Sequence, residues 1–126
     1  MSIVLITGSG RKGGIGFETA RQLGRMGNQV IISGRKPERA DALLKELHGE
    51  GIDASFTAID LTDDGNVEDA AAAIEKQYGK IDILINDAAL MQAGASVEEQ
   101  DLDELRRVFD TNVVGAWSVT QKFLPL

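Results

Sequence analysis

The stretch Ile3-Val4-Leu5-Ile6-Thr7-Gly8-Ser9-Gly10-Arg11-Lys12-Gly13-Gly14-Ile15-Gly16 decides the fold. Its first four residues form a continuous apolar run, which is typical of a strand buried in a parallel sheet. Five glycines follow, and the last of them opens a segment with helical spacing of its apolar residues. Glycines let the backbone turn sharply and approach a pyrophosphate, and free N–H groups at a helix N-terminus face that anion. The stretch therefore predicts a strand, a phosphate-binding loop and a helix.

Two other interpretations of the glycine loop are weaker. A P-loop needs a lysine and then a serine or threonine after its second glycine, where this chain has Gly14 and Ile15. A merely flexible loop remains the alternative. The position of the loop, directly between a strand and a helix, favours phosphate binding.

The rest of the chain repeats the alternation of strand and helix. Apolar runs predict further strands at Val30–Ile32, Ala54–Asp60 and Ile81–Ile85. Helical spacing predicts helices at Ile15–Met26, from Pro37 to about Leu47, from Thr62 or Asp63 to Tyr78, and over Leu102–Leu124. Strands joined by crossover helices predict an α/β fold with a doubly wound parallel sheet and flanking helices. With a glycine loop after its first strand, this sheet is expected to be a partial Rossmann fold with strand order 3-2-1-4.

Composition sets limits on function. The 126 residues suit one domain, and the net charge of −7 argues against a broad nucleic-acid surface. No cysteine is present, and His48 is the only histidine, so we expect no metal site. The calcium-like run at Asp60 has Ala71 where the twelfth position needs Glu. The apolar stretch Ile3–Ile6 is too short for a signal peptide or a membrane span, so the expected location is cytoplasmic.

Four motifs occur in a characteristic order. They are the loop from Thr7-Gly8, Asp60-Leu61, Asn86-Asp87-Ala88-Ala89, and Thr111-Asn112-Val113-Val114-Gly115. Together they resemble the short-chain dehydrogenase/reductase family, in particular its carbonyl-reductase-like members, over essentially the whole chain. The resemblance implies that the loop holds a cofactor pyrophosphate, with Asp60 and Leu61 at the adenine and Asn86 and Ala88 along the ribose and pyrophosphate. The expected cofactor-binding residues are Gly8, Ser9, Gly10, Arg11, Lys12, Gly14, Ile15, Gly16, Arg35, Asp60, Leu61, Asn86 and Ala88.

Two departures from the family pattern affect this expectation. Five residues separate Gly8 from Gly14, where the family has three. Either the loop bulges, or Gly8, Gly10 and Gly13 contact the phosphate in another register. The family's Asn-Asn-Ala-Gly also has Asp87 at its second position, which puts a charge in place of an amide that usually braces the sheet.

The second strand points to NADP rather than NAD. An NAD site usually has a carboxylate at the end of this strand, but Ser33-Gly34-Arg35-Lys36 contains none before Glu38. Arg35 can pair with a 2′-phosphate through its planar guanidinium, with Arg11 or Lys12 as a second cation. The alternative is that these are ordinary solvated charges.

The resemblance implies catalysis by a tyrosine and a lysine four residues later, with a serine upstream. Residues at i and i+4 share a helix face, so an ammonium can lower the phenol pKa while the phenol protonates a carbonyl oxygen. The only tyrosine, Tyr78, has Asp82 four residues on and precedes Gly79, which indicates a structural role. Only Asn112 remains of the catalytic set, where the family uses it to position the lysine through water; the alternative is a capping or helix-bending amide.

We therefore expect residues 1–126 to be one NADP-binding domain, truncated before the Ser-Tyr-Lys region. The full-length protein would pass hydride between NADPH and a small carbonyl or alcohol substrate, with no nucleic acid or membrane as partner. Two alternatives stay open, a non-catalytic nucleotide-binding or interaction module and a subunit completed by another polypeptide. The strand Ile81–Ile85 would form an apolar edge, which predicts a homo-oligomer or self-association.

Overall fold

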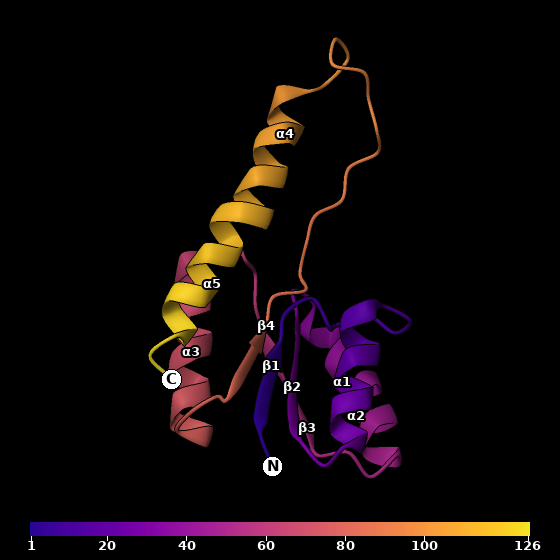
Figure 1. The fold of residues 1–126 in the computed structure, drawn as a ribbon, viewed down its shortest axis with the longest axis vertical. Helices are drawn as coiled ribbons and strands as arrows, with labels where there is room; N and C mark the ends of the chain where they lie inside the picture. Colours follow the sequence, from indigo (N-terminus) through magenta and orange to yellow (C-terminus); the bar gives the residue numbers. More distant parts are fainter.

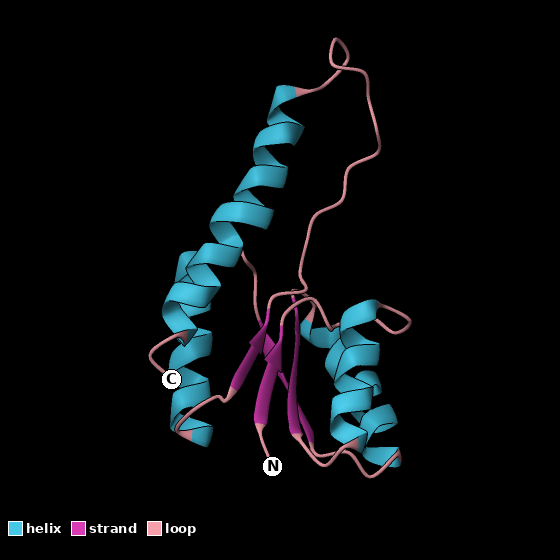
Figure 2. Cartoon of the chain, viewed as in Figure 1, coloured by secondary structure: helices cyan, strands magenta, loops and turns pink.

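The computed structural model describes residues 1–126 and contains one parallel sheet with helices on both faces (Figures 1 and 2). The strands are β1 (Ile3–Ile6), β2 (Gln29–Gly34), β3 (Ala54–Ala58) and β4 (Ile83–Ile85), in the order β3-β2-β1-β4. The helices are α1 (Ile15–Arg25), α2 (Ala40–Gly49) after a 3₁₀ turn (Pro37–Arg39), α3 (Asp64–Tyr78), α4 (Leu102–Phe109) and α5 (Ala116–Phe123). The predicted doubly wound Rossmann sheet of order 3-2-1-4 is confirmed.

Strand β1 lies in the middle of the sheet and supplies both halves of the core. Val4 and Ile6 point toward α1 and α2, whereas Leu5 points toward α3 and α5, because successive side chains of a strand face opposite ways. All three side chains are completely buried. Figure 1 shows α1 and α2 on one side of the sheet and α3 and α5 on the other. The apolar run at the N-terminus is thus a strand covered on both faces.

Strand β4 is shorter than predicted, because it pairs with β1 only through Ile83, Leu84 and Ile85. Asp82 precedes it and bonds to the edge of β1 in another way. Its N–H donates to the carbonyl of Ile3 at 2.9 Å, and its carboxylate accepts from the N–H of Ile3 at 2.8 Å. The regular ladder therefore begins two residues later than predicted, after this contact of Asp82 with Ile3.

The predicted last helix is continuous in space but not uniform. A π-helical turn (Asp110–Gly115) joins α4 to α5, and π turns are frequent at functional sites. The segment α4 extends past the carboxyl ends of the strands, together with the long connection that follows β4 (Figure 1). Of this long helix, only the α5 part packs on the sheet, through Val119 and Phe123, both of which are buried.

No helix in the structure is both long enough and apolar enough to cross a membrane.

Candidate cofactor-binding site

The glycine loop leaves β1 through a conformation that only glycine adopts easily. Gly8 has a φ of +67°, in the left-handed region. A methyl group at Gly8 would stand 2.6 Å from the Cα of Ala88, so the loop is in close contact with the chain that follows β4. Gly8 thus brings the loop against the chain after β4 at the carboxyl edge of the sheet, and the expected contact of the loop with a pyrophosphate stays a prediction.

The two extra residues form a tight turn at the tip of the loop. The N–H of Gly14 donates to the carbonyl of Arg11 at 3.2 Å, and Gly13 has a φ of +79° within that turn. Such a turn needs a glycine where φ is positive. Gly14 then caps α1, which begins at Ile15. This geometry supports the bulged register, in which Gly14, Ile15 and Gly16 open the helix.

The first turn of α1 presents unpaired donors. Gly14 has no side chain to cap the helix, and the N–H groups of Ile15, Gly16 and Phe17 have no hydrogen-bond partner. These groups carry the partial positive charge of the helix N-terminus. Gly16 is buried and the side chain of Ile15 is exposed. The arrangement can accept an anion from the solvent side.

Ser9 has a structural role within the loop. Its hydroxyl is fully buried, donates to the carbonyl of Ile6 at 2.7 Å and accepts from the N–H of Ser33 at 2.8 Å. These bonds hold the loop to the end of β2. A methyl group on Gly10 would stand 3.0 Å from the Cα of Gly34, so β2 also touches the loop. Although Ser9 is one of the expected contact residues, its side chain therefore faces inward.

Thr7 joins the glycine loop to the chain after β4. Its hydroxyl oxygen accepts hydrogen bonds from the N–H groups of Asp87 and Ala88, both at 3.1 Å. The side chain of Asn86 turns away and donates to the hydroxyl of Thr120 on α5 at 3.0 Å. Ala88 thus lies at the glycine loop, and Asn86 is held beside it by α5. Thr7 belongs to the motif that the sequence indicated, but its bridging role could not be predicted from the sequence.

Asp60 and Leu61 follow β3 at the same edge of the sheet. The carboxylate of Asp60 accepts from the N–H and the hydroxyl of Thr62, at 2.9 and 2.7 Å. These bonds from Thr62, first the hydroxyl and then the amide, lower the pKa of Asp60, and the nearby charge of Arg35 lowers it further. The Leu61 side chain is buried in the core cluster under α3 and α5.

A pocket of about 520 Å³ lies between the glycine loop and α2. Its cations are Arg11, Lys12 and Arg39, and two glutamates, Glu38 and Glu46, also line it. Lys12 is paired with Glu46 at 3.4 Å, whereas Arg11 and Arg39 form no ion pair.

The predicted cation Arg35 does not line this pocket; it is exposed and its charge acts on Asp60. Arg39 stands in the pocket instead, at the end of the 3₁₀ turn that precedes α2. In the sequence, Arg39 is noticeable only as one of a group of five basic residues in an acidic chain, with Arg11, Lys12, Arg35 and Lys36. The structure therefore separates the basic residues into a pocket group and Arg35.

Asn112 lies in the π-helical turn, and both ends of its amide are engaged. Its oxygen accepts from the N–H of Leu90 at 2.7 Å, and its Nδ2 donates to the carbonyl of Leu90 at 2.9 Å. The side chain pairs with the backbone as a neighbouring strand would. Asn112 therefore anchors the connection after β4 to the long helix.

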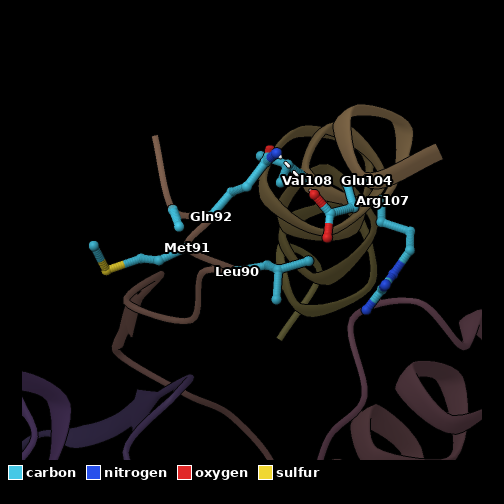
Figure 3. Close-up of a pocket in the computed structure, with 7 residues that line it drawn as sticks. Leu90, Met91, Gln92, Glu104, Arg107 and Val108 are labelled. Carbon is cyan, nitrogen blue, oxygen red and sulfur yellow. Dashed lines mark hydrogen bonds between the residues drawn. The ribbon is translucent and has the colours of Figure 1, made fainter. Parts of the chain in front are cut away.

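A smaller pocket of about 190 Å³ opens beside this anchor (Figure 3). It lies between the connection after β4 and α4, and the amide of Gln92 donates to the carboxylate of Glu104 at 3.0 Å across it. Its lining residues are Leu90, Met91, Gln92, Ala93, Glu104, Arg107 and Val108. Small-molecule sites typically occupy about 300–1,000 Å³, so this pocket alone does not define a ligand.

The remaining candidates have structural partners. The Tyr78 hydroxyl donates to Ser55 Oγ at 2.7 Å, and a ring nitrogen of His48 lies 2.8 Å from the carbonyl of Ala54. No group of three or more histidine, aspartate or glutamate side chains comes together as a metal ligand set.

A parallel sheet of order 3-2-1-4, whose first strand leads through a glycine loop into a helix, defines a Rossmann fold. Within that class, the chain belongs to the short chain dehydrogenase family, which it matches over residues 2–126. It is 34% identical to an uncharacterized oxidoreductase, YxjF, of Bacillus subtilis over 98% of this chain and 47% of that protein.

Two solved structures are similar to the chain along its length. A variant of actinorhodin polyketide ketoreductase with NADPH is 32% identical, with a TM-score of 0.88 over 98% of this chain and 46% of that one. A gluconate 5-dehydrogenase from Burkholderia cenocepacia, in complex with NADP and tartrate, is 32% identical, with a TM-score of 0.89 over 98% and 48%. The chain spans about half the length of the relatives it matches.

Proposed function

We propose that this chain is the NADP-binding portion of a short-chain oxidoreductase. One observation supports the proposal above all. The N–H groups at the start of α1 have no hydrogen-bond partner, and the pocket beside the glycine loop contains Arg11 and Arg39. An anion at the helix N-terminus and a second phosphate near the arginines is the charge pattern of NADP. NADP or NADPH is also present in the two solved structures described above.

The residues of the site fit such a cofactor. The turn at Gly13 has open space around its Cα, and no side chain makes a capping hydrogen bond at the start of α1. We assign the pyrophosphate to the backbone of Gly14, Ile15 and Gly16, and the 2′-phosphate to Arg11 and Arg39. The remaining expected residues, Gly8, Gly10, Lys12, Arg35, Asp60, Leu61, Asn86 and Ala88, would surround the adenosine and ribose through their backbone or side chains.

In the full-length protein, bound NADPH would supply a hydride to a carbonyl compound, or NADP would accept one from an alcohol. The residues of this chain bind and orient the cofactor for that reaction. We assign to Asn112 a positioning role, because its amide fixes Leu90 and with it the connection after β4. The proton donor would lie beyond these residues, since the Tyr78 hydroxyl is engaged with Ser55 on the edge of β3.

Calorimetric titration of the chain with NADPH and NADH tests the proposal. We expect NADPH to bind more tightly, and Arg11→Ala and Arg39→Ala each to reduce that preference about 5- to 30-fold, since charge-assisted hydrogen bonds contribute about 1–2 kcal/mol. Arg35→Ala is the matched control for the assignment of the 2′-phosphate to the pocket. If Arg35→Ala reduced the preference for NADPH more than Arg39→Ala did, the 2′-phosphate would have to be assigned to the end of β2. Equal binding of NADPH and NADH by the wild-type chain would contradict the NADP preference.

A second candidate is a non-catalytic nucleotide-binding module. The observation in its favour is that the chain itself contains no Tyr-x-x-x-Lys pair. Both candidates predict cofactor binding, so the discriminating test is turnover of NADPH with a panel of carbonyl compounds by the full-length protein. Consumption of NADPH that follows the carbonyl concentration would exclude the module.

A further inference from the structure

Asp87 brings a carboxylate to the first turn of α1. A methyl group at Gly16 would stand 2.6 Å from Oδ2 of Asp87, so the carboxylate lies directly against the backbone of Gly16. The position is well fixed, because the N–H of Asp87 donates to Thr7 Oγ1 at 3.1 Å and to the carbonyl of Ile85 at 3.2 Å. An acidic side chain is thus held at the place where the helix presents its free donors.

The carboxylate of Asp87 has no partner in the protein. It accepts no hydrogen bond and forms no ion pair, although the unpaired N–H groups of α1 lie beside it. The arginines of the pocket are engaged neither with it nor with each other. Its negative charge is therefore uncompensated by any side chain, and the helix N-terminus is the positive group next to it.

We propose that Asp87 sets the strength of cofactor binding by opposing the pyrophosphate. This inference rests on the proposed function, because it places the pyrophosphate at the same helix end. Two negative charges within a few ångströms repel each other by an amount that depends strongly on solvent access. An amide of the same shape, as the family has at this position, would keep the contact with Gly16 and remove the repulsion. The charge at Asp87 lowers the affinity for the dinucleotide without closing the site.

The test compares NADPH binding by the wild-type chain and by Asp87→Asn. We expect Asp87→Asn to bind NADPH about three- to tenfold more tightly, which is the size of a partly screened charge repulsion. Asp69→Asn, an exposed carboxylate on α3 with no contacts of its own, is the matched control for the change of net charge. Adenosine 2′-monophosphate, which has the 2′-phosphate and lacks the pyrophosphate, should bind both proteins equally. Thermal unfolding of each variant shows whether the fold is kept.

The outcomes separate this inference from the proposed function. Equal NADPH affinity in wild type and Asp87→Asn, or an equal gain in Asp69→Asn, would overturn the role of Asp87 and leave cofactor binding intact. Weaker binding by Asp87→Asn would also overturn it, because the carboxylate would then be an acceptor for the ligand. No NADPH binding by either protein would overturn the proposed function and, with it, this inference.

Discussion

At the scale of single residues, the candidate site depends on glycines, which lack a Cβ and so allow two backbone segments to come into contact. Gly8 passes under Ala88 and Gly10 passes against Gly34, and a methyl group at either position would meet backbone atoms at 2.6 to 3.0 Å. Backbone atoms cannot move aside as a flexible side chain can. The backbone at the carboxyl edge of the sheet is therefore closely packed around the glycine loop. The hydrogen-bond donors that stay free there are the N–H groups at the start of α1.

Asp60 gives the stability of the protein a dependence on pH. Its pKa lies below the ordinary 3.8 because its carboxylate accepts hydrogen bonds from Thr62. The ionised form is favoured in the folded state, so its stabilising effect is present above the unfolded pKa and is lost as the pH falls through the folded pKa. We expect wild type to lose stability below about pH 4 more steeply than Asp60→Asn, which cannot titrate.

Urea unfolding between about pH 2.5 and 6 measures this difference. Thr62→Ala removes the hydroxyl donor and keeps the backbone donor, so its acid response should lie between those of the other two proteins. Identical slopes for all three proteins on the acid side would show that Asp60 titrates normally in the folded state.

At the scale of elements, the connection between β4 and α4 is attached to the long helix by one side chain. Asn112 pairs with both backbone groups of Leu90, and the π-helical turn places it there. At the end of the same turn, a methyl group at Gly115 would stand 2.7 Å from the Cβ of Leu61, so the helix also packs closely on the segment that follows β3. The turn thus links three segments that lie far apart in the sequence.

Asn112→Ala should destabilise the protein by about 1–3 kcal/mol, because it leaves the N–H and carbonyl of Leu90 without partners. We expect the amide of Leu90 to exchange its hydrogen faster, in line with local opening of this connection. Asn86→Ala is the matched control, since it removes a single exposed hydrogen bond to Thr120 and should cost less than about 1 kcal/mol. Unchanged exchange at Leu90 in Asn112→Ala would contradict the anchoring role.

At the scale of the whole molecule, one side of the protein is unusually apolar. The exposed face of the long helix contains Leu102, Leu105, Phe109, Val113, Val114 and Trp117, and we call it the apolar helix face. Strand β4 forms the edge of the sheet, with Ile83 42% exposed. An apolar patch and an open strand edge both favour association with another surface.

We expect the chain to self-associate in a concentration-dependent manner, and Trp117→Glu to weaken this association about tenfold. Trp117 is 72% exposed at the C-terminal end of the apolar helix face and is its largest side chain, and a charge there would have to be desolvated. Met26→Glu is the matched control, because Met26 is 75% exposed at the end of α1, on the opposite side of the sheet. Sedimentation velocity over a range of concentrations makes the measurement, and a monomer at all concentrations would contradict the prediction.

Most of the fold could be predicted, because the spacing of apolar residues indicates which face of each element is buried and the turn residues mark where the elements end. The succession of elements followed from continuous apolar runs and the helices between them, and the strand order followed from the glycine loop that marks a Rossmann fold. The start of β4 could not be predicted, since the Asp82 side chain takes the place of a ladder bond through a contact with Ile3. The apolar spacing after Leu102 also predicted a helix, yet it did not reveal the π turn or which face would stay open.

The sequence by itself determined the family, the glycine loop and the absence of an acid at the end of β2, because these are matters of residue type and order. The tertiary structure decided which basic residues share a pocket, since Arg39 approaches Arg11 only when α2 packs beside the loop. It also turned Ser9 inward and set Asp87 against Gly16. These placements depend on distances between segments separated by up to some eighty residues, and only the packed sheet brings those segments into contact.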